Sequence, residues 1–89
     1  MDLKGTAARL IEARIALGLS KSDFADSVGI DRSSYTKIEK GEKPLKADMG
    51  YEIAERWGVT MDFLYRGRLS DLPENLAQTL RTNRIQRQE

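Results

Sequence analysis

Residues 24–43 read FADSVGIDRSSYTKIEKGEK, and this stretch decides the predicted fold. An apolar helical pattern runs as far as Gly29, stops, and begins again three residues later with Tyr35 and Ile38 facing the same interior. Ala25 is small enough for two helices to cross closely, and a glycine at position 29 tolerates the positive φ of a tight turn. The apolar side chains that fill the space between the helices are Phe24, Val28, Ile30, Tyr35 and Ile38. Two short helices joined by such a turn and crossing steeply form a helix-turn-helix unit.

The outward face of the second helix in this unit carries hydrogen-bond donors and no acid. The side chains that point away from the core are Arg32, Ser33, Thr36, Lys37 and Lys40. In a helix-turn-helix that binds DNA, this helix enters the major groove with its first residues nearest the base edges. Arg32 can donate two hydrogen bonds to guanine, and Ser33 and Thr36 can bond base edges or meet a thymine methyl group. Lys37 can reach guanine or phosphate. A solvated basic face is the alternative, but the turn pattern beside it favours base contact.

The remaining apolar spacings predict more short helices and no strand. Helices are expected over residues 6–17, 21–28, 32–39 and 47–57, then a fifth that carries Met61, Phe63, Leu64 and Tyr65, and a sixth that Asp71 and Pro73 open. No segment alternates with a period of two residues, so we predict an all-α fold of five or six helices around one core. We expect residues 1–68 to form the DNA-binding domain. Residues 69–89 are expected to form a C-terminal helix with a frayed basic tail, an element that could dimerise.

Composition excludes most enzyme chemistry. The 89 residues fit one small domain, and 39% hydrophobic with 33% charged residues is typical of a soluble globular protein. The absence of cysteine and histidine excludes disulfides, thiolate or imidazole metal sites and the nucleophile pairs that need either residue. We therefore expect no enzyme, no metal and no cofactor. The charged N-terminus, MDLKGTAARLIEAR, argues against a secretory signal, and no apolar run could span a membrane, so we expect a cytoplasmic protein.

The run from Arg9 to Leu64, with GLSKSDFADSVGIDRSSYTKIEKGE at 18–42 and IAERWGVTMDFL at 53–64, resembles the phage repressor and Cro type of helix-turn-helix regulators, the Xre-like group. The resemblance implies a lambda-repressor-like domain of five helices that acts as a homodimer on a DNA operator with paired half-sites. By position it implies base contact for Arg32, Ser33 and Lys37 and phosphate contact for Lys21 and Lys40. Lys43, a basic residue in the loop after the third helix, is also predicted to contact a phosphate.

Two features depart from the family pattern. Members often have glutamine at position 21, where the amide orders a phosphate and a recognition-helix side chain together, whereas Lys21 can hold only the phosphate. Glu42, Pro44 and Leu45 stand where members often have basic residues. We expect both departures to weaken DNA binding.

Arg14 is expected to have a structural role. It lies on the apolar face of the first helix, four residues after Leu10 and three before Leu17, where an isolated charge would be costly to bury. The family resemblance suggests Glu39 as its partner, in an ion pair that fixes the recognition helix against the first helix. The alternative is two unrelated surface charges. Among the other candidates, we assign Trp57 and Phe63 to core packing and Asp48, Glu52 and Glu55 to a solvated helix face.

The sequence therefore predicts a sequence-specific transcriptional regulator, a stand-alone dimeric repressor that reads the major groove. We expect no sensor or protease module, because few residues follow the fifth helix. The alternative is an antitoxin or protein-interaction module in which DNA binding is secondary. It is kept open by an apolar stripe of Leu69, Leu72, Leu76 and Leu80, which could dock a toxin, a second subunit or the chain's own helices. The tail arginines Arg81, Arg84 and Arg87 could meet flanking phosphates, although a solvated, frayed end is the simpler interpretation.

Overall fold

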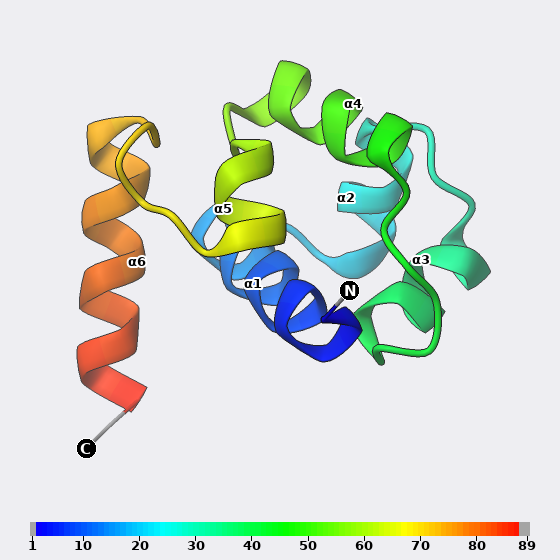
Figure 1. Ribbon diagram of the computed structural model, residues 1–89, viewed down its shortest axis with the longest axis horizontal. Helices are drawn as coiled ribbons and strands as arrows, with labels where there is room; N and C mark the ends of the chain where they lie inside the picture. Colours follow the sequence, from blue (N-terminus) through cyan, green and yellow to red (C-terminus); the bar gives the residue numbers. More distant parts are fainter. Residues whose placement is uncertain (1, 88–89) are drawn as a thin grey trace.

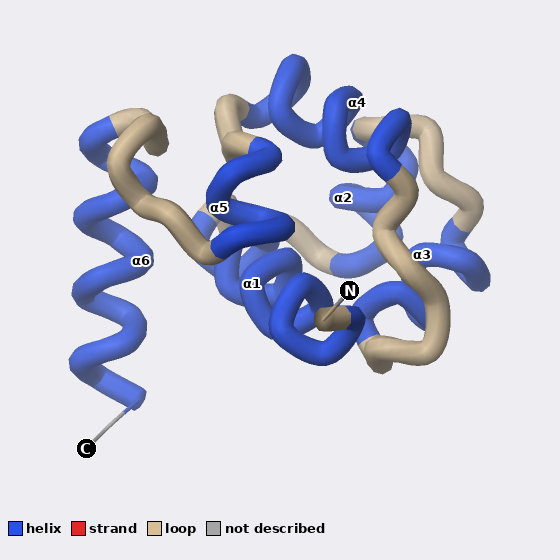
Figure 2. The backbone as a smooth tube through the Cα atoms, in the orientation of Figure 1, coloured by secondary structure: helices blue, strands red, loops and turns tan. Residues whose placement is uncertain are grey.

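The computed structural model describes residues 2–87, which fold into helices and connecting loops without a strand (Figures 1 and 2). The helices are α1 (Leu3–Ala16), α2 (Lys21–Ser27), α3 (Arg32–Glu39), α4 (Ala47–Trp57), α5 (Met61–Arg66) and α6 (Glu74–Arg87). The prediction of an all-α fold is confirmed. The bounds of α2, α3 and α4 lie within about one residue of the expected ones, and α5 contains the residues assigned to the fifth helix.

Side-chain caps explain where several helices begin. Ser20 Oγ accepts from the backbone N–H of Asp23 at 3.1 Å, and Thr60 Oγ1 accepts from that of Phe63 at 3.1 Å. α1 begins at Leu3, three residues before the expected start. The reason is a cap that the prediction did not consider, since the Asp2 carboxylate accepts from the backbone N–H of Gly5 at 2.9 Å.

α6 corrects the expectation of a frayed end. The helix continues to Arg87, so the prediction is wrong for residues 81–87, whereas residues 88–89 lie outside the described part of the chain. Two arginines of α6 bind one carboxylate of α1: Arg84 Nε lies 2.6 Å and Arg87 Nη2 lies 3.0 Å from Glu12 Oε2. These ion pairs hold the last turns against α1, which explains why they remain helical.

α1 lies at the centre of the fold and packs against α3, α5 and α6, while α2 packs against α3 and α4 against α5 (Figure 1). One apolar cluster joins the helices; its largest fully buried members include Leu10, Phe24, Tyr35, Ile38, Ile53, Phe63, Leu64 and Leu80. Gly50 allows α4 to approach α5, because a Cβ at this position would lie 2.5 Å from the Tyr65 hydroxyl oxygen. That hydroxyl donates to the backbone carbonyl of Leu45 at 2.7 Å.

The leucine stripe packs within the chain. Leu72, Leu76 and Leu80 are buried in the common cluster, and Leu69 packs against it while partly buried. The division of the chain into residues 1–68 and 69–89 stays a prediction. Phe63 is buried, Trp57 is partly buried against the core, and the three acids assigned to solvent, Asp48, Glu52 and Glu55, are exposed. Within the described residues, no helix has the length and apolar character that crossing a membrane requires.

Candidate nucleic-acid interface

The turn between α2 and α3 has the predicted form. Gly29 has φ +70°, and open space surrounds the position that a Cβ would take, so conformation rather than packing requires glycine here. The chain then returns to α2, since the backbone N–H of Ile30 donates to the carbonyl of Ala25 at 2.9 Å. Asp31 caps α3 by accepting from the backbone N–H of Ser34 at 3.1 Å. These contacts fix the direction in which α3 leaves the turn.

The inward face of α3 is buried as predicted. Tyr35 and Ile38 are both almost fully shielded from solvent. The ring of Tyr35 packs against that of Phe24 in α2, with centroids 5.5 Å apart and a tilt of 50°. Because these side chains point into the core, the opposite face of α3 is directed away from it.

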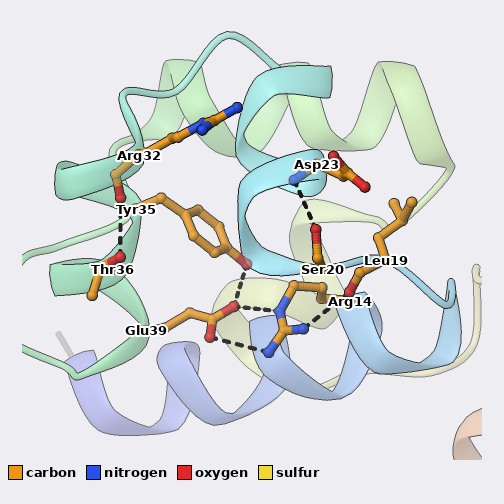
Figure 3. A network of polar contacts seen from close by, with 8 residues as sticks. All are labelled: Arg14, Leu19, Ser20, Asp23, Arg32, Tyr35, Thr36 and Glu39. Carbon is orange, nitrogen blue, oxygen red and sulfur yellow. Dashed lines mark hydrogen bonds and ion pairs between the residues drawn. The ribbon is translucent and has the colours of Figure 1, made fainter.

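A buried polar network joins α3 to α1 (Figure 3). Arg14 Nε donates to Glu39 Oε2 at 2.8 Å, and Arg14 Nη1 donates to the backbone carbonyl of Leu19 at 3.0 Å. The hydroxyl of Tyr35 donates to the same Glu39 oxygen, and burial raises the pKa of Tyr35. The hydrogen bond to Glu39 in turn raises the pKa of Arg14. The residues that the resemblance pairs, Arg14 and Glu39, therefore lie in contact, together with a third member that the sequence interpretation left out.

Arg32, at the start of the outward face, is exposed and has a partner within the chain. It extends from α3 toward α2 (Figure 3), where its Nε lies 3.1 Å from Asp26 Oδ1 and its Nη2 lies 2.6 Å from Asp26 Oδ2. The hydrogen bond from Arg32 lowers the pKa of the Asp26 carboxyl. Asp26 was absent from the predicted site, and the six-residue separation gives no helical spacing that could have indicated it.

The two hydroxyl groups of the predicted site donate within the chain. Ser33 Oγ donates to Asp31 Oδ2 at 2.5 Å, and Thr36 Oγ1 donates to the backbone carbonyl of Arg32 at 3.0 Å. The hydrogen bond from the Ser33 hydroxyl lowers the pKa of Asp31. Both hydroxyl oxygens retain lone pairs that can accept, and Thr36 also carries a methyl group.

The lysines of the predicted site surround this face. Lys21 begins α2, Lys37 lies on α3 and Lys40 follows its last residue, and all three are exposed. Within residues 2–87 none of these three forms an ion pair. Lys43, in the loop after α3, donates from Nζ to Ser34 Oγ at 3.2 Å. The face thus combines a short row of donors on α3 with exposed cations at the start of α2 and the end of α3, an arrangement suited to base edges flanked by phosphates.

Comparison with known families agrees with this geometry. A family model described as helix-turn-helix matches residues 10–64, which is more than half of the chain. The matched segment begins in α1, ends in α5 and contains the whole of α2, the turn and α3. No curated protein and no solved structure matches the sequence. The chain belongs to the Xre- and Cro-like helix-turn-helix family of DNA-binding regulators.

Proposed function

We propose that this protein is a sequence-specific repressor that places α3 in the major groove of its DNA operator. The observation that carries the proposal is the division of α3 into two faces. Tyr35, Ile38 and Glu39 are buried and fix the helix against α1 and α2, whereas Arg32 and Lys37 on the opposite face are exposed. A helix held rigidly by one face can present the other in a reproducible position, which base recognition requires.

The hydrogen bonds within the chain refine the proposed role of each base-contacting residue. Arg32 and Lys37 donate to guanine O6 and N7, and Lys37 can also reach a phosphate. Thr36 presents its methyl group to a thymine methyl, because its hydroxyl proton is directed to the carbonyl of Arg32. Ser33 accepts from an adenine or cytosine amino group, because its own proton is directed to Asp31.

The proposed phosphate contacts come from Lys21, Lys40 and Lys43. Each contact should contribute about 0.9 to the slope of log affinity against log salt concentration. Replacing Lys40 with alanine should therefore lower affinity similarly for all DNA sequences. It should also reduce the magnitude of the slope by about 0.9, the contribution of one phosphate contact. A change in base preference without a change in slope would assign Lys40 to bases instead.

We further propose that the protein is cytoplasmic and that two copies of the chain bind the paired half-sites of one operator. They would repress transcription by occupying the DNA. The large apolar side chains that remain exposed in residues 2–87 are Ile15 on α1, Tyr51 on α4 and Ile85 on α6. α1 and α6 pack together, so Ile15 and Ile85 are candidates for the subunit contact. Ile85→Glu should then shift sedimentation from dimer to monomer. Deleting residues 70–89 would be a poor test, because it removes three buried leucines from the core.

The alternative of a protein-interaction module loses the feature that motivated it. The stripe formed by Leu72, Leu76 and Leu80 is buried against the chain's own helices and is not available to a toxin. The arginines of the tail are likewise engaged, since Arg84 and Arg87 bind Glu12. DNA recognition through α3 is therefore the better supported proposal.

Selection of bound duplexes from a random pool tests the proposal. We expect a symmetric site whose half-sites are about 34 Å apart, one turn of the duplex. Arg32→Ala should lose discrimination at one base pair of each half-site by roughly 5- to 150-fold, the range of one bidentate base contact. Arg68→Ala, which removes an exposed charge outside α2 and α3, serves as the control. Failure to enrich any sequence, or an unchanged preference in Arg32→Ala, would contradict the proposal.

A further inference from the structure

The contact between Arg32 and Asp26 uses a particular edge of the guanidinium group. Its Nε and Nη2 atoms donate to the two oxygens of the Asp26 carboxylate at 3.1 and 2.6 Å. A guanidinium carries five N–H groups in a plane, and this side-on contact occupies two of them. Within residues 2–87 no hydrogen bond uses the end of the group, which is formed by Nη1 and the second hydrogen of Nη2. This end presents two parallel donors, the geometry that guanine O6 and N7 accept.

Asp26 belongs to α2 and Arg32 to α3, so the contact spans the helix-turn-helix. The backbone beneath it is fixed, because Asp26 lies in the last turn of α2 and its carbonyl accepts from the N–H of Gly29 at 3.2 Å. A carboxylate held in this way restricts the rotamers of an exposed arginine, which otherwise has a large conformational entropy to lose when it binds.

We propose that Asp26 is a specificity-determining positioning residue, which holds the guanidinium of Arg32 by its side while leaving the end of the group free to recognise guanine. The inference rests on the proposed base contact by Arg32. Asp26 has no base to contact in this arrangement and acts through the arginine. Because DNA phosphates repel an exposed carboxylate, Asp26 should also reduce affinity for DNA of arbitrary sequence while it increases the preference for guanine.

These two opposite effects, on general affinity and on guanine preference, would distinguish Asp26 from a purely structural residue. Loss of a structural residue would weaken binding to all duplexes together. Loss of Asp26 should lower discrimination at one base pair and leave affinity for unrelated duplexes equal or higher. If Asp26 instead blocks Arg32, its removal would tighten binding to the guanine site most and would increase discrimination at that base pair.

The matched variants are Asp26→Ala and Asp23→Ala. Both remove one carboxylate from the exposed face of α2, but Asp23 makes no side-chain hydrogen bond to Arg32 and influences it only by its charge. Affinity should be measured for the selected site, for the same site with the guanine pair replaced, and for an unrelated duplex. Thermal unfolding of each variant checks that the fold is retained.

We expect Asp26→Ala to lower the ratio of affinities for the guanine and replaced sites about two- to fivefold, the fold-change equivalent of one exposed ion pair. Asp23→Ala should leave this ratio unchanged while raising affinity for all three duplexes. In an Arg32→Ala background, Asp26→Ala should have no further effect on the ratio.

An unchanged ratio in Asp26→Ala, with the wild-type protein still preferring guanine, overturns the role of Asp26 and leaves the proposed function intact. An increased ratio, with a larger gain in affinity for the guanine site than for the replaced site, would mean that Asp26 blocks Arg32, and this result also overturns the positioning role. A wild-type protein without preference at any base pair overturns the proposed function and this inference together.

Discussion

Two arginine–carboxylate pairs link α3 to neighbouring helices, and they differ mainly in burial. Arg14 and Glu39 meet at 2.8 Å with side-chain exposures of 13% and 3%, whereas Arg32 and Asp26 meet at 2.6 Å with exposures of 66% and 51%. The distances are similar, so the chemistry of the contact does not distinguish the pairs. Access to water distinguishes the two pairs. The buried pair is shielded from solvent, and each member of the exposed pair can exchange its partner for solvent or DNA.

We infer from this difference that the buried pair fixes the fold, and we propose that the exposed pair orients a side chain that binds DNA. Breaking a buried pair leaves a desolvated charge without a partner, which costs about 3 to 5 kcal/mol. Breaking an exposed pair returns both charges to water and costs about 1 kcal/mol or less. The buried pair should therefore govern the free energy of unfolding, and the exposed pair should govern base preference.

The largest expected effect is on the buried pair. Arg14→Ala should lower the free energy of unfolding by about 3 to 5 kcal/mol, because the Glu39 carboxylate keeps its burial and loses its main partner. Urea denaturation measures the change. The double variant Arg14→Met with Glu39→Leu should recover much of the loss, since no unpaired charge remains. A loss below about 1 kcal/mol in the single variant would place this pair in the same class as the exposed one.

The hydroxyl of Tyr35 adds a third member to the buried pair, because it donates to Glu39. Tyr35→Phe keeps the ring and removes one donor to Glu39, so it should destabilise the fold by about 1 to 3 kcal/mol. Thermal unfolding checks this, with Tyr51→Phe as the exposed control. Equal stability of Tyr35→Phe and the wild-type protein would show that Arg14 alone satisfies Glu39.

Glu12 and Arg84 form an intermediate case, with side-chain exposures of 11% and 36%. The hydrogen bond from Arg84 lowers the pKa of Glu12 below its ordinary value of 4.5. The pair therefore contributes its stability above pH 4.5 and loses it as the pH falls through the lowered value. Glu12→Gln should reduce stability at neutral pH by up to about 1 kcal/mol and show a shallower loss in acid. Urea midpoints from pH 7 to pH 3 measure this, and a slope as steep as that of the wild-type protein would refute it.

The smallest expected effect is that of the exposed pair on folding. Arg32→Ala should leave the free energy of unfolding almost unchanged, because both charges of the pair are already hydrated. Urea denaturation of Arg32→Ala and Arg14→Ala under the same conditions compares their free energies of unfolding. A loss comparable with that of Arg14→Ala would mean that Arg32 holds α3 in place, and its effect on binding could no longer be assigned to bases.

Local pattern made much of the fold predictable. The apolar spacing and Gly29 specify α2, the turn and α3, and the inward positions of Tyr35 and Ile38 then define the outward face. The contact of Tyr35 with Glu39 could also have been predicted, since residues four apart lie on the same helix face. Arg14 and Glu39 were paired only through the family resemblance, because no local rule links α1 to α3.

The features that were missed depend on how the helices cross. Asp26 reaches Arg32 only because the turn brings the end of α2 beside the start of α3, and a linear pattern contains no such geometry. The last turns of α6 are ordered by Glu12, a residue 72 positions earlier than Arg84. The directions of the Ser33 and Thr36 protons likewise follow from the folded backbone, although both residues were identified as part of the outward face.

Methylation interference can show whether Arg32 contacts a guanine in the major groove, as we propose. A methyl group on guanine N7 occupies the acceptor that the free end of the Arg32 guanidinium needs. Methylation of one guanine in each half-site should weaken binding by the wild-type protein and have no effect on Arg32→Ala. Binding by the wild-type protein that tolerates methylation of every guanine in its selected site would contradict the claim.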